Sequence, residues 1–296
     1  MKFVTITGGL GNQLFIYSFS EALRAKGKKV ALFVPHRTNS QAYGHQGYEL
    51  EKLFPIKTDK GLFTGLIVGL LSVYSHLLRF FPAKFRPVLY RMIGIHVVNV
   101  DENFIYYPEV FSDKHTHELF RGTWQSELYF KDASEQVRQA LVFRKELLSV
   151  MTKKIAEDMK TEQCVSIHVR RGDYLSNQYA SGFAGVCIPD YYSRAIDLIN
   201  SKMDSPCFYV FTDDKEWVNS NFQLKNAIYV VHNSGKDSWQ DMYLMSQCHH
   251  NIIANSSFSW WGAWLNSNPD KIVIAPEKWW SLFEKDDVIP ENWVRL

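Results

Sequence analysis

Histidine, arginine and aspartate side chains follow one apolar run in the middle of the chain, in the sequence HVRRGD at residues 168–173. The run over 164–169 is typical of a strand, in which successive side chains point to opposite faces. His168 and Arg170 therefore share one face, and Arg171 lies on the other. This pair at a strand end is suited to hold phosphate, because a guanidinium offers paired N–H donors to its oxygens. A structural ion pair between one arginine and Asp173 is the alternative interpretation.

Polar residues also follow two later runs that are typical of strands, 207–211 and 251–254. Asp213 follows the first, and one carboxylate there suits the N–H donors of a purine or the hydroxyls of a ribose. Asp214 is expected to cap the next helix. The second run is followed by hydroxyl and amide side chains at the start of a predicted helix, where the helix dipole favours an anion. These residues are Asn255, Ser256 and Ser257, with Phe258 after them.

The first strand, predicted over 3–7, is followed by a glycine-rich turn, GGLGNQ at residues 8–13. Gly9 and Gly11 let backbone amides approach a phosphate or a sugar. A turn that only needs positive φ is the alternative, but the amides of Asn12 and Gln13 favour a binding loop. The turn is neither a Walker phosphate loop nor a dinucleotide fingerprint, because no Gly-Lys-Ser/Thr follows it and no acidic residue ends the second strand.

Strands alternating with helices of about 10–14 residues predict a doubly wound α/β fold with parallel sheets. We expect two domains, residues 1–155 and 156–296, with the last residues free to pack back on the first domain. A charged helix over 131–160 is expected to link them. Residues 36–125 carry a weaker pattern. The tryptophans of the last predicted helix lie at helical spacing and are expected in the core: Trp260, Trp261 and Trp264.

Composition excludes several classes of protein and of partner. The 296 residues carry 33 Lys and Arg against 31 Asp and Glu, a net charge of +2 that gives no nucleic-acid-binding surface. Four cysteines without a CxxC pair predict buried thiols in a reducing compartment, and no secretory signal is evident. The protein is therefore expected in the cytoplasm. No Asp-x-Asp is present and the His pairs lack metal-site spacing, so no metal is expected.

One apolar segment, Leu62 to Leu78, is followed by the basic residues Arg79, Lys84, Arg86 and Arg91. A buried helix pair near the prolines that follow is one interpretation. Peripheral contact with an anionic membrane, on its cytoplasmic face, is a second, because basic residues flank the apolar stretch. A transmembrane helix is a third, at the lower limit of length.

Four blocks in this order, GGLGNQLFIY, HVRRGDY, FTDD and NSSFSWWGAWL, resemble those of the α-1,2-fucosyltransferases and cover the chain from end to end. The resemblance implies a GT-B-like fold, two Rossmann-like domains facing across a cleft. It implies an inverting glycosyltransferase that moves L-fucose from GDP-β-L-fucose to the 2-hydroxyl of a terminal galactose. The implied partners are this nucleotide sugar and a galactose-terminated glycan, as in O-antigen or other glycan biosynthesis. The implied enzyme is metal-independent and needs no cofactor.

Site residues follow from the same resemblance. Arg170 would hold the pyrophosphate, and His168 and Asp173 are the candidates for the catalytic base. The implied nucleotide-binding residues are Gly9, Gly11, Asn12, Gln13, His168, Arg170, Asp213, Asn255, Ser256, Ser257 and Phe258. An NAD(P)-dependent oxidoreductase, another nucleotide-sugar transferase and a carbohydrate-binding protein are the rival functions. The acceptor glycan, including whether it is lipid-linked, stays open.

Overall fold

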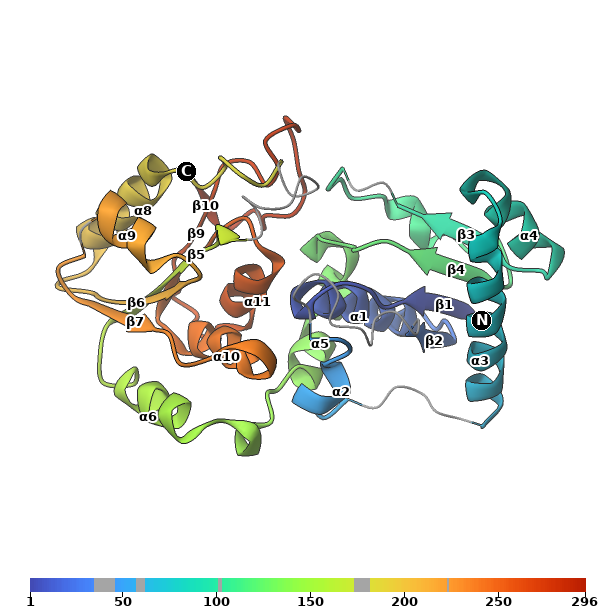
Figure 1. Cartoon of the computed structure of the whole chain (residues 1–296), viewed down its shortest axis with the longest axis horizontal. Coiled ribbons are helices and arrows are strands. Elements are labelled where there is room, and N and C mark those ends of the chain that lie inside the picture. Colours follow the sequence, from blue (N-terminus) through green and yellow to red (C-terminus); the bar gives the residue numbers. More distant parts are fainter. Residues whose placement is uncertain (35–45, 57–61, 101–102, 173–181, 223) are drawn as a thin grey trace. The chain divides into compact units, whose positions relative to one another are not determined.

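The computed structural model describes residues 1–34, 46–56, 62–100, 103–172, 182–222 and 224–296. It divides into two compact units, Met1–Arg144 and Lys145–Leu296. This division lies earlier in the chain than the expected one after residue 155. Each unit contains a parallel sheet with helices, in agreement with the predicted α/β class (Figure 1).

The first unit is built on a four-stranded parallel sheet of order β2-β1-β4-β3. Lys2 starts β1 and is buried there because its ammonium group lies 2.6 Å from the carboxylate of Glu118 in β4. The elements are β1 (Lys2–Thr5), α1 (Leu10–Ala25), β2 (Val30–Phe33), α2 (Leu50–Leu53), α3 (Leu62–Leu77), α4 (Arg86–Met92), β3 (His96–Asn99), β4 (Glu118–Arg121) and α5 (Ser134–Ala140).

The second unit has a six-stranded parallel sheet of order β10-β9-β8-β5-β6-β7. Its core packs Val165, Ile167 and Val169 of β5 against Tyr191 and Tyr192 of α8. The elements are α6 (Val150–Asp158), β5 (Cys164–Val169), α8 (Pro189–Lys202), β6 (Cys207–Thr212), α9 (Lys215–Asn221), β7 (Ala227–Val230), α10 (Trp239–Gln247), β8 (His250–Ile252), α11 (Ser257–Leu265), β9 (Val273–Ala275) and β10 (Val294–Arg295).

The expected charged helix over 131–160 is wrong, because α5 ends at Ala140 and the next α-helix, α6, begins only at Val150. Phe143 is buried, and its ring centroid lies 4.8 Å from that of Phe54. A continuous helix would withdraw it from that contact. Ser149 then starts α6, because its hydroxyl accepts a hydrogen bond from the Thr152 amide at 3.1 Å.

The chain end belongs to the second sheet: Val294 pairs with Ile274 and Arg295 with Ala275. Trp260, Trp261 and Trp264 of α11 are buried, which confirms that they belong to the core. The indole N–H of Trp260 donates to the carbonyl of Val288 at 2.9 Å, so this large side chain is buried without losing its hydrogen bond.

Candidate active site

Three of the predicted groups of residues lie at neighbouring strand ends in the second unit. From β5 the chain proceeds to β6 and β7 on one side, whereas β8 and β9 lie on the other side. Such a reversal of strand order leaves a crevice at the carboxyl ends of the strands, where α/β proteins bind ligands. His168 and Arg170 occupy the end of β5, Asn255 and Ser256 follow β8, and Asp213 follows β6.

The two faces of β5 differ as the alternation predicts. The valine and isoleucine side chains pack on α8, whereas the Ser166 hydroxyl, on the other face, accepts a hydrogen bond from Asn251 at 2.7 Å. His168 is 7% exposed, and its ring centroid lies 6.1 Å from that of Phe258 in α11. The imidazole is therefore held beside the first turn of this helix.

Arg170 and Arg171, which follow β5, have different surroundings. The Arg171 guanidinium lies 4.3 Å from the Trp217 ring centroid, and its Nε is 3.1 Å from Asp214 Oδ2. Arg170 Nε lies 3.6 Å from Asp213 Oδ2, and its side chain is 39% exposed. Arg171 thus connects the end of β5 to α9. That Arg170 shares the side of His168 stays a prediction from strand alternation. Asp173, the predicted alternative partner, lies outside the described residues.

Asp213 holds the turn that follows β5. Its two carboxylate oxygens accept the backbone N–H groups of Arg171 at 2.9 Å and of Gly172 at 3.1 Å. A Cβ at Gly172 would lie 3.1 Å from Asp213 Oδ2, closer than an ordinary contact. The arrangement gives Asp213 a positioning role for the Arg170 backbone, and its expected contact with a purine or ribose stays a prediction.

Asp214 caps α9, as predicted. Its carboxylate accepts the Trp217 amide at 2.9 Å. This bond, followed by the Arg171 ion pair, lowers the pKa of Asp214. The carboxylate is therefore the ionised partner of Arg171.

The first turn of α11 presents the residues that follow β8. The Ser256 hydroxyl caps the helix by accepting the Phe258 amide at 3.3 Å. Ser257 and Phe258 are partly exposed at this end. The N-terminal amides and the dipole of a helix favour an anion at such a position. A phosphate near Arg170 would find this second source of positive potential.

Asn255 is only 1% exposed and links three segments of the unit. Its amide donates to the carbonyls of Phe183 at 3.0 Å and of Trp279 at 3.2 Å. The Cys187 thiol donates to its Oδ1 at 3.4 Å, and burial raises the pKa of this thiol to about 12. These bonds make Asn255 a positioning residue, and its direct contact with a nucleotide stays a prediction.

The glycine turn lies at the corresponding reversal of strand order in the first unit, between β1 and β4. Gly8 has φ of +75°, which favours glycine. Gln13 is fully buried; its amide donates to the Gly8 carbonyl at 2.9 Å and to the Gly47 carbonyl at 2.6 Å. Gln13 therefore holds the turn from inside, whereas Asn12 is partly exposed at the start of α1.

Gln125 is a candidate that the sequence reasoning missed. It follows β4, and its amide donates to Asn12 Oδ1 at 2.8 Å, so the two loops at this switch point are joined. The preceding Trp124 has φ of +54°, a strained conformation that is frequent at functional sites. The sequence does carry one sign of the strand end before Gln125, because Gly122 directly follows the run ELFR.

Glu49 is a buried carboxyl beside the same turn. Its backbone N–H donates to Gln13 Oε1 at 3.0 Å, and it is 6% exposed. Burial raises the pKa of Glu49 to about 7. The sequence pattern did not single it out.

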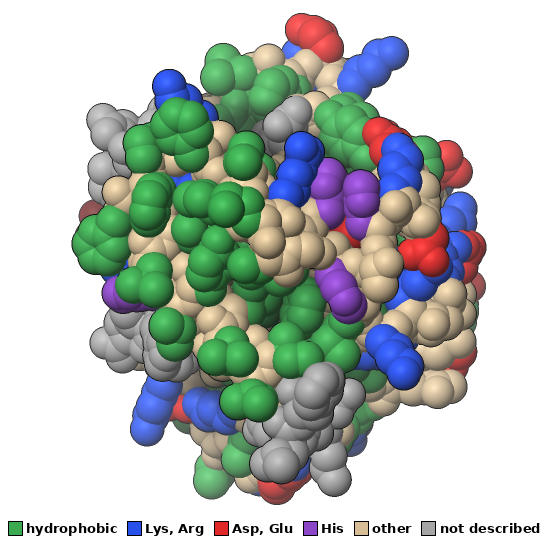
Figure 2. All heavy atoms as spheres, turned by 90° about the vertical axis from the view of Figure 1, so that its right-hand side faces the viewer, with side chains coloured by type: hydrophobic (Ala, Val, Ile, Leu, Met, Phe, Trp, Pro, Cys, Tyr) green, Lys and Arg blue, Asp and Glu red, His purple; other side chains and the backbone are tan. Residues whose placement is uncertain are grey.

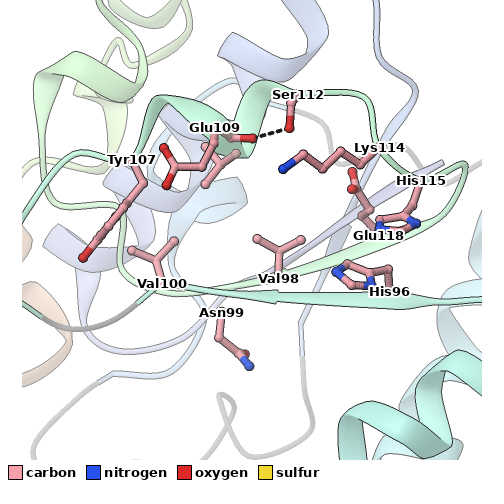
Figure 3. Close-up of a pocket in the computed structure, with 11 residues that line it drawn as sticks. His96, Val98, Asn99, Val100, Tyr107, Glu109, Ser112, Lys114, His115 and Glu118 are labelled. Carbon is pink, nitrogen blue, oxygen red and sulfur yellow. Dashed lines mark hydrogen bonds between the residues drawn. The ribbon is translucent and has the colours of Figure 1, made fainter.

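A polar pocket of about 300 Å³ runs along β3 in the first unit (Figure 3). His96 and His115 stack at one end, with ring centroids 3.9 Å apart, and Tyr107 lies at the other. Burial, and then the neighbouring His115, lower the pKa of His96. The pocket follows the edge strand, and the glycine turn does not line it.

A metal site would need several His, Cys, Asp or Glu side chains close together in the described part of the chain. No group of three or more His, Cys, Asp or Glu side chains there could hold a metal ion. The two carboxylates that follow β6 are already engaged, because Asp213 accepts two backbone N–H groups and Asp214 pairs with Arg171. Arg170 and the N-terminus of α11 stay the predicted phosphate-binding groups.

The chain is similar to known glycosyltransferases. Residues 101–296 match glycosyl transferase family 11. The chain is 33% identical to the O-antigen biosynthesis glycosyltransferase WbnK of Escherichia coli, over 98% of this chain and 99% of that protein. It is 31% identical to an alpha-1,2-colitosyltransferase of Escherichia coli, over 98% and 97%.

More distant similarities are also found. A galactoside alpha-(1,2)-fucosyltransferase 1 of Saimiri boliviensis boliviensis is 25% identical over 64% of this chain and 60% of that protein. Among solved structures, NodZ alpha-1,6-fucosyltransferase soaked with GDP-fucose covers 91% of this chain and 96% of its own. Its TM-score is 0.52 at 13% identity. This likeness supports the GT-B-like α/β fold.

Proposed function

The chain belongs to glycosyl transferase family 11, and from this premise we propose that it is a galactoside α-1,2-fucosyltransferase. It moves L-fucose from GDP-β-L-fucose to the 2-hydroxyl of a terminal galactose. The observation that carries the proposal is the position of His168 near the end of β5, with its ring centroid 6.1 Å from that of Phe258 in α11 and with Arg170 directly after the strand. Its full-length similarity to O-antigen and α-1,2-linking transferases supports the reaction class.

In this proposal the diphosphate lies between Arg170 and the N-terminus of α11. The guanidinium and the helix dipole stabilise the negative charge that develops on GDP as the glycosidic bond breaks. Ser256 and Ser257 offer hydroxyls near the phosphates, and Phe258 with His168 borders the nucleotide. Asp213 and Asn255 hold the two loops in place through the hydrogen bonds described above.

Gly9, Gly11 and Asn12 of the glycine turn approach the donor sugar or the galactose, and Gln13 supports them from within. The galactose 2-hydroxyl attacks the anomeric carbon as the bond to GDP breaks, and the hydroxyl proton passes to a base. His168 and Asp173 are the proposed candidates for that base. The positive groups of the site supply the charge that a metal would otherwise provide, so the reaction is expected to proceed without one.

A second donor has a specific observation in its favour. The alpha-1,2-colitosyltransferase aligns over nearly the whole chain, whereas the α-1,2-fucosyltransferase aligns over about two thirds of it. A nucleotide-activated colitose is therefore the second candidate donor, with the same linkage and the same phosphate site.

The test is a transfer assay with excess EDTA. GDP-fucose, GDP-mannose, UDP-galactose and activated colitose are each offered with a soluble β-galactoside. Transfer from GDP-fucose with an α-1,2 linkage, established by NMR of the product, is the expected result. Transfer from activated colitose alone would identify colitose as the donor sugar in place of fucose. Transfer only from a UDP-sugar would overturn the assignment of GDP as the nucleotide. Binding of β-galactoside without any transfer would favour the carbohydrate-binding alternative.

A further inference from the structure

The outer face of α3 and α4 exposes an unusual number of large apolar side chains. Figure 2 shows them gathered on this face of the molecule, with Lys and Arg side chains around them. More than half of each of six side chains is exposed: Leu66, Leu70, Val73, Phe80, Val88 and Met92. We call this group the apolar face. It differs from the scattered exposed apolar residues that are normal on proteins, because its members come from one continuous segment.

The inner face of the same helices is packed and leaves no way to bury the outer one. Leu71 and Leu78 are each 3% exposed and join the core cluster that includes Phe3 and Leu119 of the sheet. Thus α3 already covers the sheet with one side, and its other side is equally apolar. The interpretation as a buried helix pair is wrong for this outer side.

Hydrogen bonds hold the two helices together. The Tyr74 hydroxyl donates to the Leu89 carbonyl at 2.8 Å, and the Tyr90 hydroxyl donates to Ser75 Oγ at 2.6 Å. Arg121 of the sheet donates in turn to the Tyr90 hydroxyl at 2.6 Å. These bonds, together with the core packing, anchor the pair to the sheet, so the apolar face is a built surface of the folded unit.

A groove of about 390 Å³ opens on the apolar face, and its walls are aliphatic apart from Tyr74. Leu70, Ile93 and Ile95 line it. Water in such a groove gains few hydrogen bonds, so an apolar occupant is favoured.

The segment that carries the apolar face has Lys and Arg but no acidic side chain. Residues 61–100 contain no Asp or Glu, but they contain four basic residues. Arg79, Lys84 and Arg91 are exposed, and Arg86 is partly buried by donating to the carbonyls of Phe81 and Arg79. The surface therefore combines apolar side chains with cations that are exposed to solvent.

We propose that this surface docks on a bilayer that contains anionic phospholipids. Apolar side chains would enter the boundary between headgroups and acyl chains, and the cations would meet the phosphates. A second copy of the chain fits less well, because a symmetric dimer through this face would bring its cations against the same cations. Within the described residues, no helix is long and apolar enough to cross a membrane, which leaves docking at the surface.

The test is sedimentation of the purified full-length chain with vesicles, one set of pure phosphatidylcholine and one with 30% phosphatidylglycerol. The chain is expected to sediment with the anionic vesicles and to be released by salt, which screens the attraction. Replacing Arg79 and Lys84 by Ala is expected to weaken vesicle binding about 25-fold, because each cation near the surface contributes about 1 kcal/mol, or about fivefold in affinity. The triple variant Leu70→Ser, Phe80→Ser, Met92→Ser is expected to abolish it.

The control is a matched triple variant in the other unit, Val150→Ser, Met151→Ser, Leu282→Ser, which removes three side chains that are also exposed. It is expected to bind vesicles like the unaltered chain. Failure of the unaltered chain to bind anionic vesicles would overturn the proposal. Equal loss of vesicle binding in both triple variants would also overturn it. So would a dimer of the unaltered chain in ultracentrifugation that is absent only in the Leu70, Phe80 and Met92 variant. Transfer to a soluble galactoside is measured in parallel, so failure of docking is distinguishable from failure of the proposed reaction.

Discussion

Replacing Arg170 by Ala separates its role from that of its neighbour Arg171. Both residues are arginines that face a carboxylate, at 3.6 Å for Arg170 and at 3.1 Å for Arg171. Strand alternation predicts that only Arg170 shares the face of His168. The site therefore predicts that Arg170→Ala weakens nucleotide binding and catalysis, whereas Arg171→Ala affects only the packing of α9.

The size of each effect follows from the surroundings. Charge-assisted hydrogen bonds contribute about 1.5–3 kcal/mol, so Kd for GDP should rise about 10- to 100-fold in Arg170→Ala. Loss of a group that stabilises the leaving diphosphate should lower kcat/KM by about 100- to 1000-fold. The free energy of unfolding should fall by less than about 1 kcal/mol, because the ion pair with Asp213 is partly exposed, at 39% and 30%.

Arg171→Ala reverses this pattern. It loses the contact with the Trp217 ring at 4.3 Å, worth about 0.5–1 kcal/mol, and the ion pair with Asp214. The free energy of unfolding should fall, but Kd for GDP should remain that of the unaltered chain.

The assay is isothermal titration with GDP beside initial rates of transfer and urea denaturation, on the unaltered chain, Arg170→Ala, Arg170→Lys and Arg171→Ala. Arg170→Lys should recover part of the binding, since it keeps the charge but loses the paired donors. Equal losses of GDP affinity in both Ala variants would refute the reasoning from strand faces. Normal binding in Arg170→Ala would refute the phosphate assignment.

Three further predictions concern the glycines and a buried carboxyl. Gly8→Ala and Gly27→Ala should each lose about 1–2 kcal/mol in urea denaturation, because both glycines have φ of +75°. Only Gly8→Ala should lose transfer activity, because the Cβ added at Gly8 would lie 2.7 Å from the side-chain amide of Asn12. A Cβ added at Gly27 would meet nothing within 4 Å. Equal activity in the two variants would count against the glycine turn. Gly262→Ala should lower the free energy of unfolding by about 1–3 kcal/mol, since its Cβ would lie 2.7 Å from Met245 Cβ. Gly69→Ala in α3 should raise it by up to about 1 kcal/mol, because nothing lies within 4 Å of the added Cβ. Thermal melting curves of the two variants measure the difference. Burial raises the pKa of Asp241 from 3.8 to about 7. The folded state therefore holds this proton at pH values where the unfolded state has lost it, and the free energy of unfolding falls by about 2–3 kcal/mol between pH 5 and pH 8. Asp241→Asn should remove that part of the slope in denaturation at both pH values, and an unchanged slope would contradict the assignment.

Much of the second unit is local enough to be predicted from the sequence. The run Cys164–Val169 forms β5 with the predicted bounds, and Pro189–Lys202 forms α8. Alternation along β5 also separates Arg170 from Arg171, because the period of a strand is fixed by backbone geometry. The order of the four sequence blocks was enough to indicate the family.

Two strands of the first unit could not be predicted, because tertiary contacts compensate for their composition. β4 contains Glu118, which is buried only because Lys2, more than 100 residues earlier, pairs with it. β3 is four residues long, and none of them is fully buried. A short polar strand gives no hydrophobic period from which to recognise it.

The tertiary structure alone showed which of the strand-end polar groups hold neighbouring segments of the fold. Asp213 and Asn255 appear alike in sequence as strand-end residues, but their oxygens and amide are engaged with the backbone of neighbouring segments. Likewise, the apolar run from Leu62 specifies a helix, but not whether its two sides are covered. Hydrophobicity determines that a side chain gains by leaving water, and only the packing of distant segments determines whether the fold provides a place for it.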